Sequence, residues 1–493
     1  MKKSHQVITI AAYVVFLMVL LSILGVSIAS PGNHLIPWQM LLGTVAMAVL
    51  FVLGGKLWNA VYEKIGRRTG IYLFCLAAFG VILYVNSMGR QDSSNAFADY
   101  AQIWNAAQNL ADGEPIANAY YFLIYSNNLK PMLLLSRLIR CAKLLPVTTY
   151  HFLLALNVLQ VLLTIFCCGY LAEKDGDSRW RFPVLITFVL FIPLWGMTSA
   201  FYTDSMSFGL GIICLALWKK AGKEPWRKSV PWIVLSAVVA VLAASWKITA
   251  LIPVIAGALI LLWKKLLRDW KPVVLFFTTF LLCTLGLNLW VNSYEVAKQA
   301  KSTANPVLSW VALGMNDDGS FSNNLAYADT LNALPTAEEK KIYTREYMRE
   351  NRSSLRDKSH WKKKLARNFA DGNMGVRDFL YIEYDDETLL WNCFSPWGKY
   401  WWRASEYCFC YLGAMYALLA LGAVGCLRKV IHGEEPPAML MICQLAFLGI
   451  FAFLMIWEAN NRQLYNQMPG ILLGGILSID YFWRMVNTYE NSK

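Results

Sequence analysis

A few charged side chains stand beside long apolar segments, where an ionisable group is costly to place and is therefore a candidate for function. Asp204 follows a short polar break, and Lys247 separates two apolar runs with almost no loop between them. Glu458 and Arg462 lie between the last two apolar runs, and Asp99 lies in a polar segment after the third. Cations hold phosphate oxygens, and a carboxylate can remove a proton from an attacking hydroxyl group. These residue types suit a phosphate-bearing lipid and a hydroxyl acceptor.

Each of these residues also has a structural explanation. Asp204 could cap the helix that follows it, because Asp is a favoured N-cap residue. Lys247 could extend its ammonium group toward lipid headgroups. Glu458 and Arg462 are four residues apart, the spacing of an ion pair on one helix. Asp99 could be a solvated loop residue, and the sequence leaves these alternatives open.

The composition excludes a soluble enzyme. The chain has 493 residues, of which 57% are hydrophobic and only 16% are charged, whereas soluble domains carry about 25% charged residues. Repeated apolar runs near 20 residues long predict an all-α polytopic membrane protein with about 12 transmembrane helices. The predicted spans are 7–28, 37–54, 70–88, 150–171, 182–197, 202–218, 230–246, 249–263, 272–290, 405–427, 437–457 and 466–484. The apolar stretch 131–145 carries three basic residues and predicts a helix lying in the membrane interface.

Every second connecting segment is basic. These segments contain 22 Lys and Arg against 9 Asp and Glu, an excess equal to the net charge of +13. By the positive-inside rule they face the cytoplasm together with both termini, so no nucleic-acid partner is needed to explain the charge. They are 1–6, 55–69, 172–181, 219–229, 264–271, 428–436 and 484–493. The alternate segments, which carry all five candidate residues, are then predicted to face outward.

The predicted division of the chain follows from this threading. Residues 1–290 form a transmembrane domain with a large outward loop at 89–149. Residues 291–404 form an outward domain, mostly helical because its centre is rich in Glu, Lys and Arg with few glycines, and 405–493 hold the last spans. Asp92, in the outward loop beside two serines, fits a turn better than a site.

A series of short segments resembles the glycosyltransferase C superfamily of membrane enzymes, and more closely its protein O-mannosyltransferase-like branch in Gram-positive bacteria. The segments occur in the family's order over roughly residues 90 to 470. They are Asp99-Tyr100 at the start of 98–107, the aromatic stretch 120–128, Tyr202-Thr203-Asp204, Trp246-Lys247-Ile248-Thr249, Leu313-Gly314-Met315-Asn316, Asp371-Gly372-Asn373-Met374-Gly375 and Glu458 to Pro469. The chain departs from the family at Ser126, often proline there, at Asn373-Met374 in place of Thr-Tyr, and in the looser spacing of Arg462 and Tyr465.

The resemblance implies a polyprenyl-phosphate-sugar donor, a bacterial plasma membrane, and transfer on the outer face to a cell-envelope glycan, lipid or protein. Asp99 would be the catalytic base, and an inline displacement would invert the sugar carbon. Lys247 and Arg462 would contact the donor phosphate. The substrate-binding residues would be Tyr202, Asp204, Glu458, Asn127 and Asn128.

Cofactors and rival functions complete the sequence prediction. The five histidines show no metal-binding spacing, and a divalent cation, at Asp317-Asp318 or Asp385-Asp386, is the one cofactor left open. The chain lacks a phosphate-binding loop motif, which excludes ATP-driven transport by this chain. A ligase or polymerase that uses a polyprenyl-diphosphate glycan and a lipid-linked glycan transporter remain alternatives.

Overall fold

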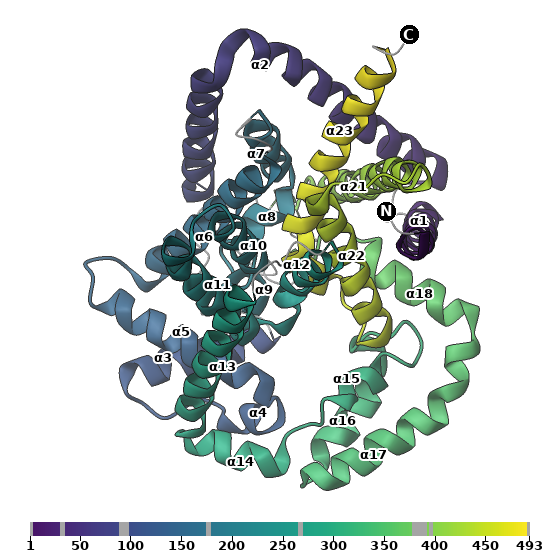
Figure 1. Cartoon of the computed structure of the whole chain (residues 1–493). Coiled ribbons are helices and arrows are strands. Elements are labelled where there is room, and N and C mark those ends of the chain that lie inside the picture. The colour runs from purple at the N-terminus through teal and green to yellow at the C-terminus, as the bar shows by residue number, and fades with distance from the viewer. Residues whose placement is uncertain are drawn as a thin grey trace.

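The described part of the chain is helical throughout its regular secondary structure (Figure 1). The computed structural model describes residues 3–29, 35–87, 98–173, 179–264, 270–376, 392–393 and 398–490. Seven helices in these residues are long and apolar enough to cross a membrane. They are α1 (Lys3–Ala29), the Pro37–Gly66 part of α2 (Pro37–Ser87), α6 (Thr149–Ala172), α11 (Trp226–Trp246), α13 (Lys271–Asn292), α21 (Trp401–Ile431) and α22 (Ala438–Ile456). This finding supports a polytopic membrane protein.

Three of the remaining predicted spans, 182–197, 202–218 and 249–263, are divided into short helices. Glycine and proline interrupt their apolar runs. Gly209 has a φ of +70° and separates α9 from α10, while Pro193 and Pro253 stand in the first turns of α8 and α12. These short helices are α7 (Arg181–Leu190), α8 (Ile192–Met197), α9 (Thr203–Met206), α10 (Leu210–Ala221), η3 (Ile248–Leu251) and α12 (Ile252–Trp263). The predicted span 466–484 lies in the unbroken 23-residue helix α23 (Met468–Glu490), which is not among the seven.

The prediction of a loop at 55–69 is wrong. Helix α2 continues through most of this segment and breaks only at Gly66, which has a φ of +73°. Nothing before Gly66 terminates the helix, since exposed Glu63 and Lys64 are compatible with a helix outside the bilayer. The two predicted spans 37–54 and 70–88 are therefore one bent element, which arches over the bundle in Figure 1.

The predicted basic segments meet at one end of the bundle. Long-range hydrogen bonds between side chains and backbone carbonyls join six of them, in two sets of three. The bonds run from Gln6 to Val430, from Trp58 to Arg179, from Lys219 to Glu173 and from Lys264 to Pro436.

The predicted outward segments meet at the other end. The amide of Asn305 donates to the carbonyl of Ile124, and the amide of Ala459 donates to the carbonyl of Gly319 at 2.7 Å. Helices α3 (Ala98–Asp112) and α5 (Leu129–Lys143) pack against each other here. The 15-residue α5 is absent from the span candidates, as expected for the stretch 131–145.

The segment after α13 forms an arc of helices that ends beside α1 in Figure 1. These helices are α14 (Glu295–Thr303), α15 (Leu308–Leu313), α16 (Leu325–Ala333), α17 (Ala337–Glu350) and α18 (Lys358–Phe369). A close approach fixes the arc on the bundle, since a Cβ at Gly314 would lie 2.5 Å from the carbonyl oxygen of Trp457. Only glycine fits at this contact, which joins the arc to the turn that carries Glu458.

Candidate active site

Asp204 is the centre of a group of ion pairs. It lies in the four-residue helix α9, and its side chain is 0% exposed. The ammonium group of Lys247 donates to its Oδ1, and Nε of Arg462 lies 3.2 Å from its Oδ2. The side chains of Lys247 and Arg462 are 17% and 20% exposed. Both cations are therefore partly accessible, while the carboxylate that they share is buried.

These contacts decide two of the alternatives that the sequence left open. Tyr202 is the N-cap of α9, and Asp204 is the second residue inside the helix, so Asp204 does not cap it. Lys247 does not extend toward lipid headgroups, because its ammonium group is directed onto Asp204. Both residues serve one ion-pair group between elements that are far apart in the sequence.

Two turns carry the cations, and buried amide side chains hold these turns together. Lys247 links α11 to η3 in an extended conformation, and Arg462 lies in η6 (Asn461–Gln467). Nδ2 of Asn466 donates to Oγ1 of Thr249 at 3.0 Å, and Nε2 of Gln467 donates to the backbone carbonyl of Thr249 at 2.7 Å. Buried amides that are hydrogen-bonded in this way specify one arrangement, which fixes the approach of both cations to Asp204.

Asp99 forms a second group on the first outward segment. It stands in the first turn of α3, and the hydroxyl of Tyr121 donates to its Oδ1 at 2.8 Å. Nδ2 of Asn128 donates to the oxygen of Tyr121. Burial, together with the nearby Asp99, raises the pKa of Tyr121 far above its usual value, so the phenol stays protonated as a donor. Asn127 is exposed and reaches this group only through its 3.1 Å hydrogen bond to Asn128.

Tyr202 connects the two groups. Its hydroxyl lies 3.5 Å from Oδ2 of Asp99, and the guanidinium carbon of Arg462 lies 5.0 Å from the centre of its ring. A guanidinium over an aromatic face is attracted by the electron-rich ring. The side chain of Tyr202 therefore places the Asp99 carboxylate beside the cations that Asp204 holds.

Glu458 lies beside both groups and is 8% exposed. Burial raises its pKa to about 7, although Arg462 acts in the opposite direction. Its carboxylate accepts a hydrogen bond from the backbone amide of Phe321, so it also contacts the helical arc. Residues 457–460 are not helical, and the four-residue spacing to Arg462 is therefore not that of a helix surface pair.

Counted by itself, the group of Asp204, Lys247 and Arg462 has one positive charge in excess, and the carboxylates of Asp99 and Glu458 lie next to it. Asp204 supplies one negative charge, while Lys247 and Arg462 supply two positive charges. Burial lowers the pKa of Lys247, and the adjacent Asp204 opposes this shift. A partly exposed pair of cations with this excess favours binding of an anion such as a phosphate group.

A family model described as conserved hypothetical integral membrane protein matches residues 5–483. The chain belongs to this family. Comparisons with curated proteins and with solved structures gave no match. Membership of this family establishes an integral membrane protein, and the residues of the site supply the evidence on its chemistry.

Lys364 also lies near the site, although the sequence did not identify it as a candidate residue. It is buried in α18, its ammonium group donates to the carbonyl of Gly314, and burial lowers its pKa to about 8. Glu458 opposes that shift, because its carboxylate is close enough to interact electrostatically with the ammonium group of Lys364. Within the run Lys362 to Lys364 all three lysines look alike in sequence, and no local signal marks the buried one.

A hollow of about 440 Å³ adjoins the site between α18 and η6. Its wall includes Asp317, Lys363, Arg367, Asp371 and Asn461. Nδ2 of Asn461 donates to Asp371 at 2.6 Å, directly beside Arg462 in the chain. The segment 371–375 therefore contacts the site. The predicted turn residue Asp92 lies outside the described residues.

The predicted metal alternatives are used differently where the structure describes them. Asp317 pairs with Lys363 at 2.7 Å, and Asp318 accepts hydrogen bonds from Ser320. Asp385-Asp386 lies outside the described residues. In the described part of the chain, no group of three or more His, Cys, Asp or Glu side chains is arranged to hold a metal ion.

Proposed function

We propose that the protein is a bacterial plasma-membrane glycosyltransferase of the glycosyltransferase C type. It would move a sugar from a polyprenyl-phosphate-linked donor to a hydroxyl of a cell-envelope glycan, lipid or protein, on the outward face of the membrane. Two kinds of evidence support this function. The site geometry suggests binding of a phosphate group and removal of a proton, and the motif resemblance suggests that a sugar is transferred.

The observation that carries the proposal is the double ion pair on Asp204. A single buried carboxylate holds Lys247 and Arg462 together with one excess positive charge, and Tyr202 links them to Asp99. A leaving phosphate needs fixed cations, and an attacking hydroxyl needs a base at a different position. The site offers both on residues that come from three distant parts of the chain.

The proposed reaction is a single displacement. Asp99 takes the proton of the acceptor hydroxyl as its oxygen forms a bond to the anomeric carbon of the sugar. The bond from that carbon to the phosphate oxygen breaks, and its electron pair leaves on the lipid phosphate. Lys247 and Arg462 stabilise the charge that accumulates there. Attack opposite the leaving group inverts the anomeric carbon.

The roles of the other predicted residues follow from their contacts. Tyr121 and Tyr202 donate to Asp99 and hold its carboxylate in one orientation. Asn128 acts on Asp99 through Tyr121. Glu458 can accept a hydrogen bond from an acceptor hydroxyl, and its location beside the arc would place the acceptor between the arc and the bundle.

The test is sugar transfer by the purified full-length protein with radiolabelled polyprenyl-monophosphate sugars. Asp99→Asn keeps the shape of the side chain and removes the base, so turnover should fall by about 10²- to 10⁴-fold. Asp112→Asn is the matched control, because Asp112 lies on the same helix α3 in an exposed ion pair with Lys143. Turnover by Asp99→Asn within a few-fold of the wild type would overturn the role of Asp99.

Two further measurements, with a polyprenyl-diphosphate glycan as donor and with the protein in vesicles, separate the two alternatives. A ligase or polymerase would consume a polyprenyl-diphosphate glycan and ignore the monophosphate donor. A transporter would move a lipid-linked glycan across a vesicle membrane without breaking the bond between sugar and phosphate.

A further inference from the structure

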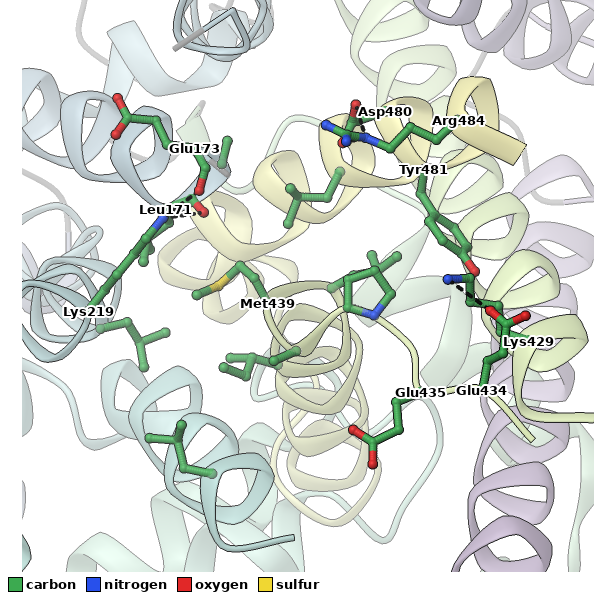
Figure 2. Close-up of a pocket in the computed structure, with 18 of the residues that line it drawn as sticks. Leu171, Glu173, Lys219, Lys429, Glu434, Glu435, Met439, Asp480, Tyr481 and Arg484 are labelled. Atoms are coloured by element: carbon green, nitrogen blue, oxygen red, sulfur yellow. Dashed lines mark hydrogen bonds and ion pairs between the residues drawn. The ribbon is translucent and has the colours of Figure 1, made fainter. Parts of the chain in front are cut away.

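A large hollow lies at the end of the bundle opposite the candidate active site. It measures about 1100 Å³ and separates the ends of α6 and α10 from α21, α22 and α23. Figure 2 shows Lys219 on one wall, Met439 at the centre, and Lys429 with Glu434 on the opposite wall. Glu458 follows the other end of the 19-residue α22, so the two regions are separated by about 28 Å along that helix.

The walls of this crevice are apolar. Large apolar side chains from five helices, α6, α10, α12, α22 and α23, line it. They are Leu171, Leu215, Trp218, Leu261, Leu440 and Leu477. A volume of 1100 Å³ exceeds the usual range for small-molecule sites, and such walls suit hydrocarbon chains.

The rim of the crevice is charged, and its acidic groups are already neutralised. Each of its four carboxylates forms an ion pair with a basic side chain of the described residues. The pairs are Glu173 with Arg181, Glu434 with Lys429, Glu435 with Lys264, and Asp480 with Arg484.

Three cations of the rim have no ion pair within the described part of the chain: Lys219, Lys223 and Arg428. Lys219 donates to the carbonyls at the end of α6, and the ammonium group of Lys223 lies 5.1 Å from the ring centre of Tyr170. Arg428 is exposed. Among the described residues, the crevice therefore combines apolar walls with three cations that form no ion pair.

We propose that this crevice is a binding site for a phosphate-bearing lipid of the adjacent membrane leaflet. The phosphate would lie at the rim, beside Lys223 or beside Arg428 on the facing wall, and the hydrocarbon chains would lie between α10, α12 and α22. Positive charge and apolar area occur together in this crevice, and a soluble anion or a neutral lipid would match only one of the two. Lipid binding here is independent of the proposed transferase activity, because no residue of the candidate active site lines the crevice.

The experiment counts lipids bound to the delipidated full-length protein by native mass spectrometry. Three probes are titrated: dioleoyl-phosphatidylglycerol, dioleoyl-phosphatidylcholine and inorganic phosphate. The anionic lipid should bind with the highest affinity. Each basic group beside an anionic lipid contributes about a factor of five, so Lys223→Gln with Arg428→Gln should weaken this binding by about tenfold or more.

A matched double variant removes the same charges from the same end of the bundle. Lys64→Gln with Arg227→Gln replaces two exposed cations that do not line the crevice, and lipid binding should be unchanged. Met439→Trp fills the crevice without altering charge and should also weaken binding of the anionic lipid. Equal binding of the two lipids, an equal loss in the control variant, or phosphate binding as tight as lipid binding would each overturn the proposal.

Discussion

Arg462 and Asp204 form a buried contact, with Nε of the arginine 3.2 Å from Oδ2 of an aspartate whose side chain is fully enclosed. The two residues are far apart in sequence and lie on different helices, α9 and η6. A buried carboxylate is stable only when cations compensate it, and the cations in turn depend on the carboxylate. Asp204 therefore has a structural role that precedes any role in catalysis.

Asp204→Asn should destabilise the fold. The substitution keeps the size of the side chain but removes the carboxylate that Lys247 and Arg462 share, at a cost of about 3 kcal/mol. The measurement is the unfolding temperature of the detergent-solubilised protein. Asp317→Asn, which breaks an exposed pair with Lys363, should cost less than about 1 kcal/mol. Adding Lys247→Met to Asp204→Asn should recover part of the loss, and a fully stable Asp204→Asn would contradict this explanation.

Tyr121→Phe should reduce turnover without unfolding the protein. It removes the hydroxyl that donates to Asp99 at 2.8 Å and accepts from Asn128, so the carboxylate loses one of its orienting contacts. A loss of about tenfold is expected, since a hydrogen bond to a charged group contributes about 1.5 kcal/mol or more. The matched control is Tyr120→Phe, because Tyr120 is the preceding residue and is 63% exposed. Equal activity of the two variants would exclude a positioning role for Tyr121.

The sequence predicts that the candidate residues lie at the same end of the bundle, but it does not predict which of them contact each other. Alternating basic segments place Asp99, Asp204, Lys247, Glu458 and Arg462 at one end of the bundle, and the structure brings them together there. That Lys247 and Arg462 share one carboxylate could not be predicted, because their approach is set by hydrogen bonds between η3 and η6. Contacts between residues more than 200 positions apart leave no trace in local patterns.

The helices show the same division. Long apolar runs predicted α1, α6, α11, α13, α21 and α22 closely, because length and hydropathy are local properties. The predicted boundaries failed where the chain bends, as at Gly66 in α2, and where Gly209 starts a new helix. A lone glycine inside an apolar run fits an unbroken span as well as a break, and tertiary packing decides between them.

Glu458 should make stability depend on pH. Its native pKa of about 7 lies above the ordinary value of 4.5, so the folded protein binds this proton more tightly than the unfolded chain. The resulting stabilisation is complete below pH 4.5 and is lost as the pH rises to about 7. Glu458→Gln is neutral throughout and should become more stable than the wild type toward pH 8, by at most about 3 kcal/mol.

Unfolding temperatures of the wild type and Glu458→Gln between pH 4.5 and 8 provide this measurement. The two curves should agree at the acidic end and separate with rising pH. Glu346→Gln replaces an exposed glutamate on α17 and should follow the wild type throughout. Parallel curves for Glu458→Gln and the wild type would show that the carboxylate is ionised in the folded protein without penalty.

Lys364 should stabilise the junction between the helical arc and the bundle. Its ammonium group donates to the carbonyl of Gly314, the glycine that contacts the backbone of Trp457 beside Glu458. Lys364→Ala leaves that carbonyl unsatisfied in a buried location and opens a cavity, which together should cost about 2 kcal/mol or more. Lys362→Ala removes an exposed lysine from the same helix and should change the unfolding temperature little. Because the junction also positions Glu458, Lys364→Ala should lower sugar transfer more than Lys362→Ala when both are assayed below their unfolding temperatures. Equal stability of the two variants would mean that the arc is held on the bundle by other contacts.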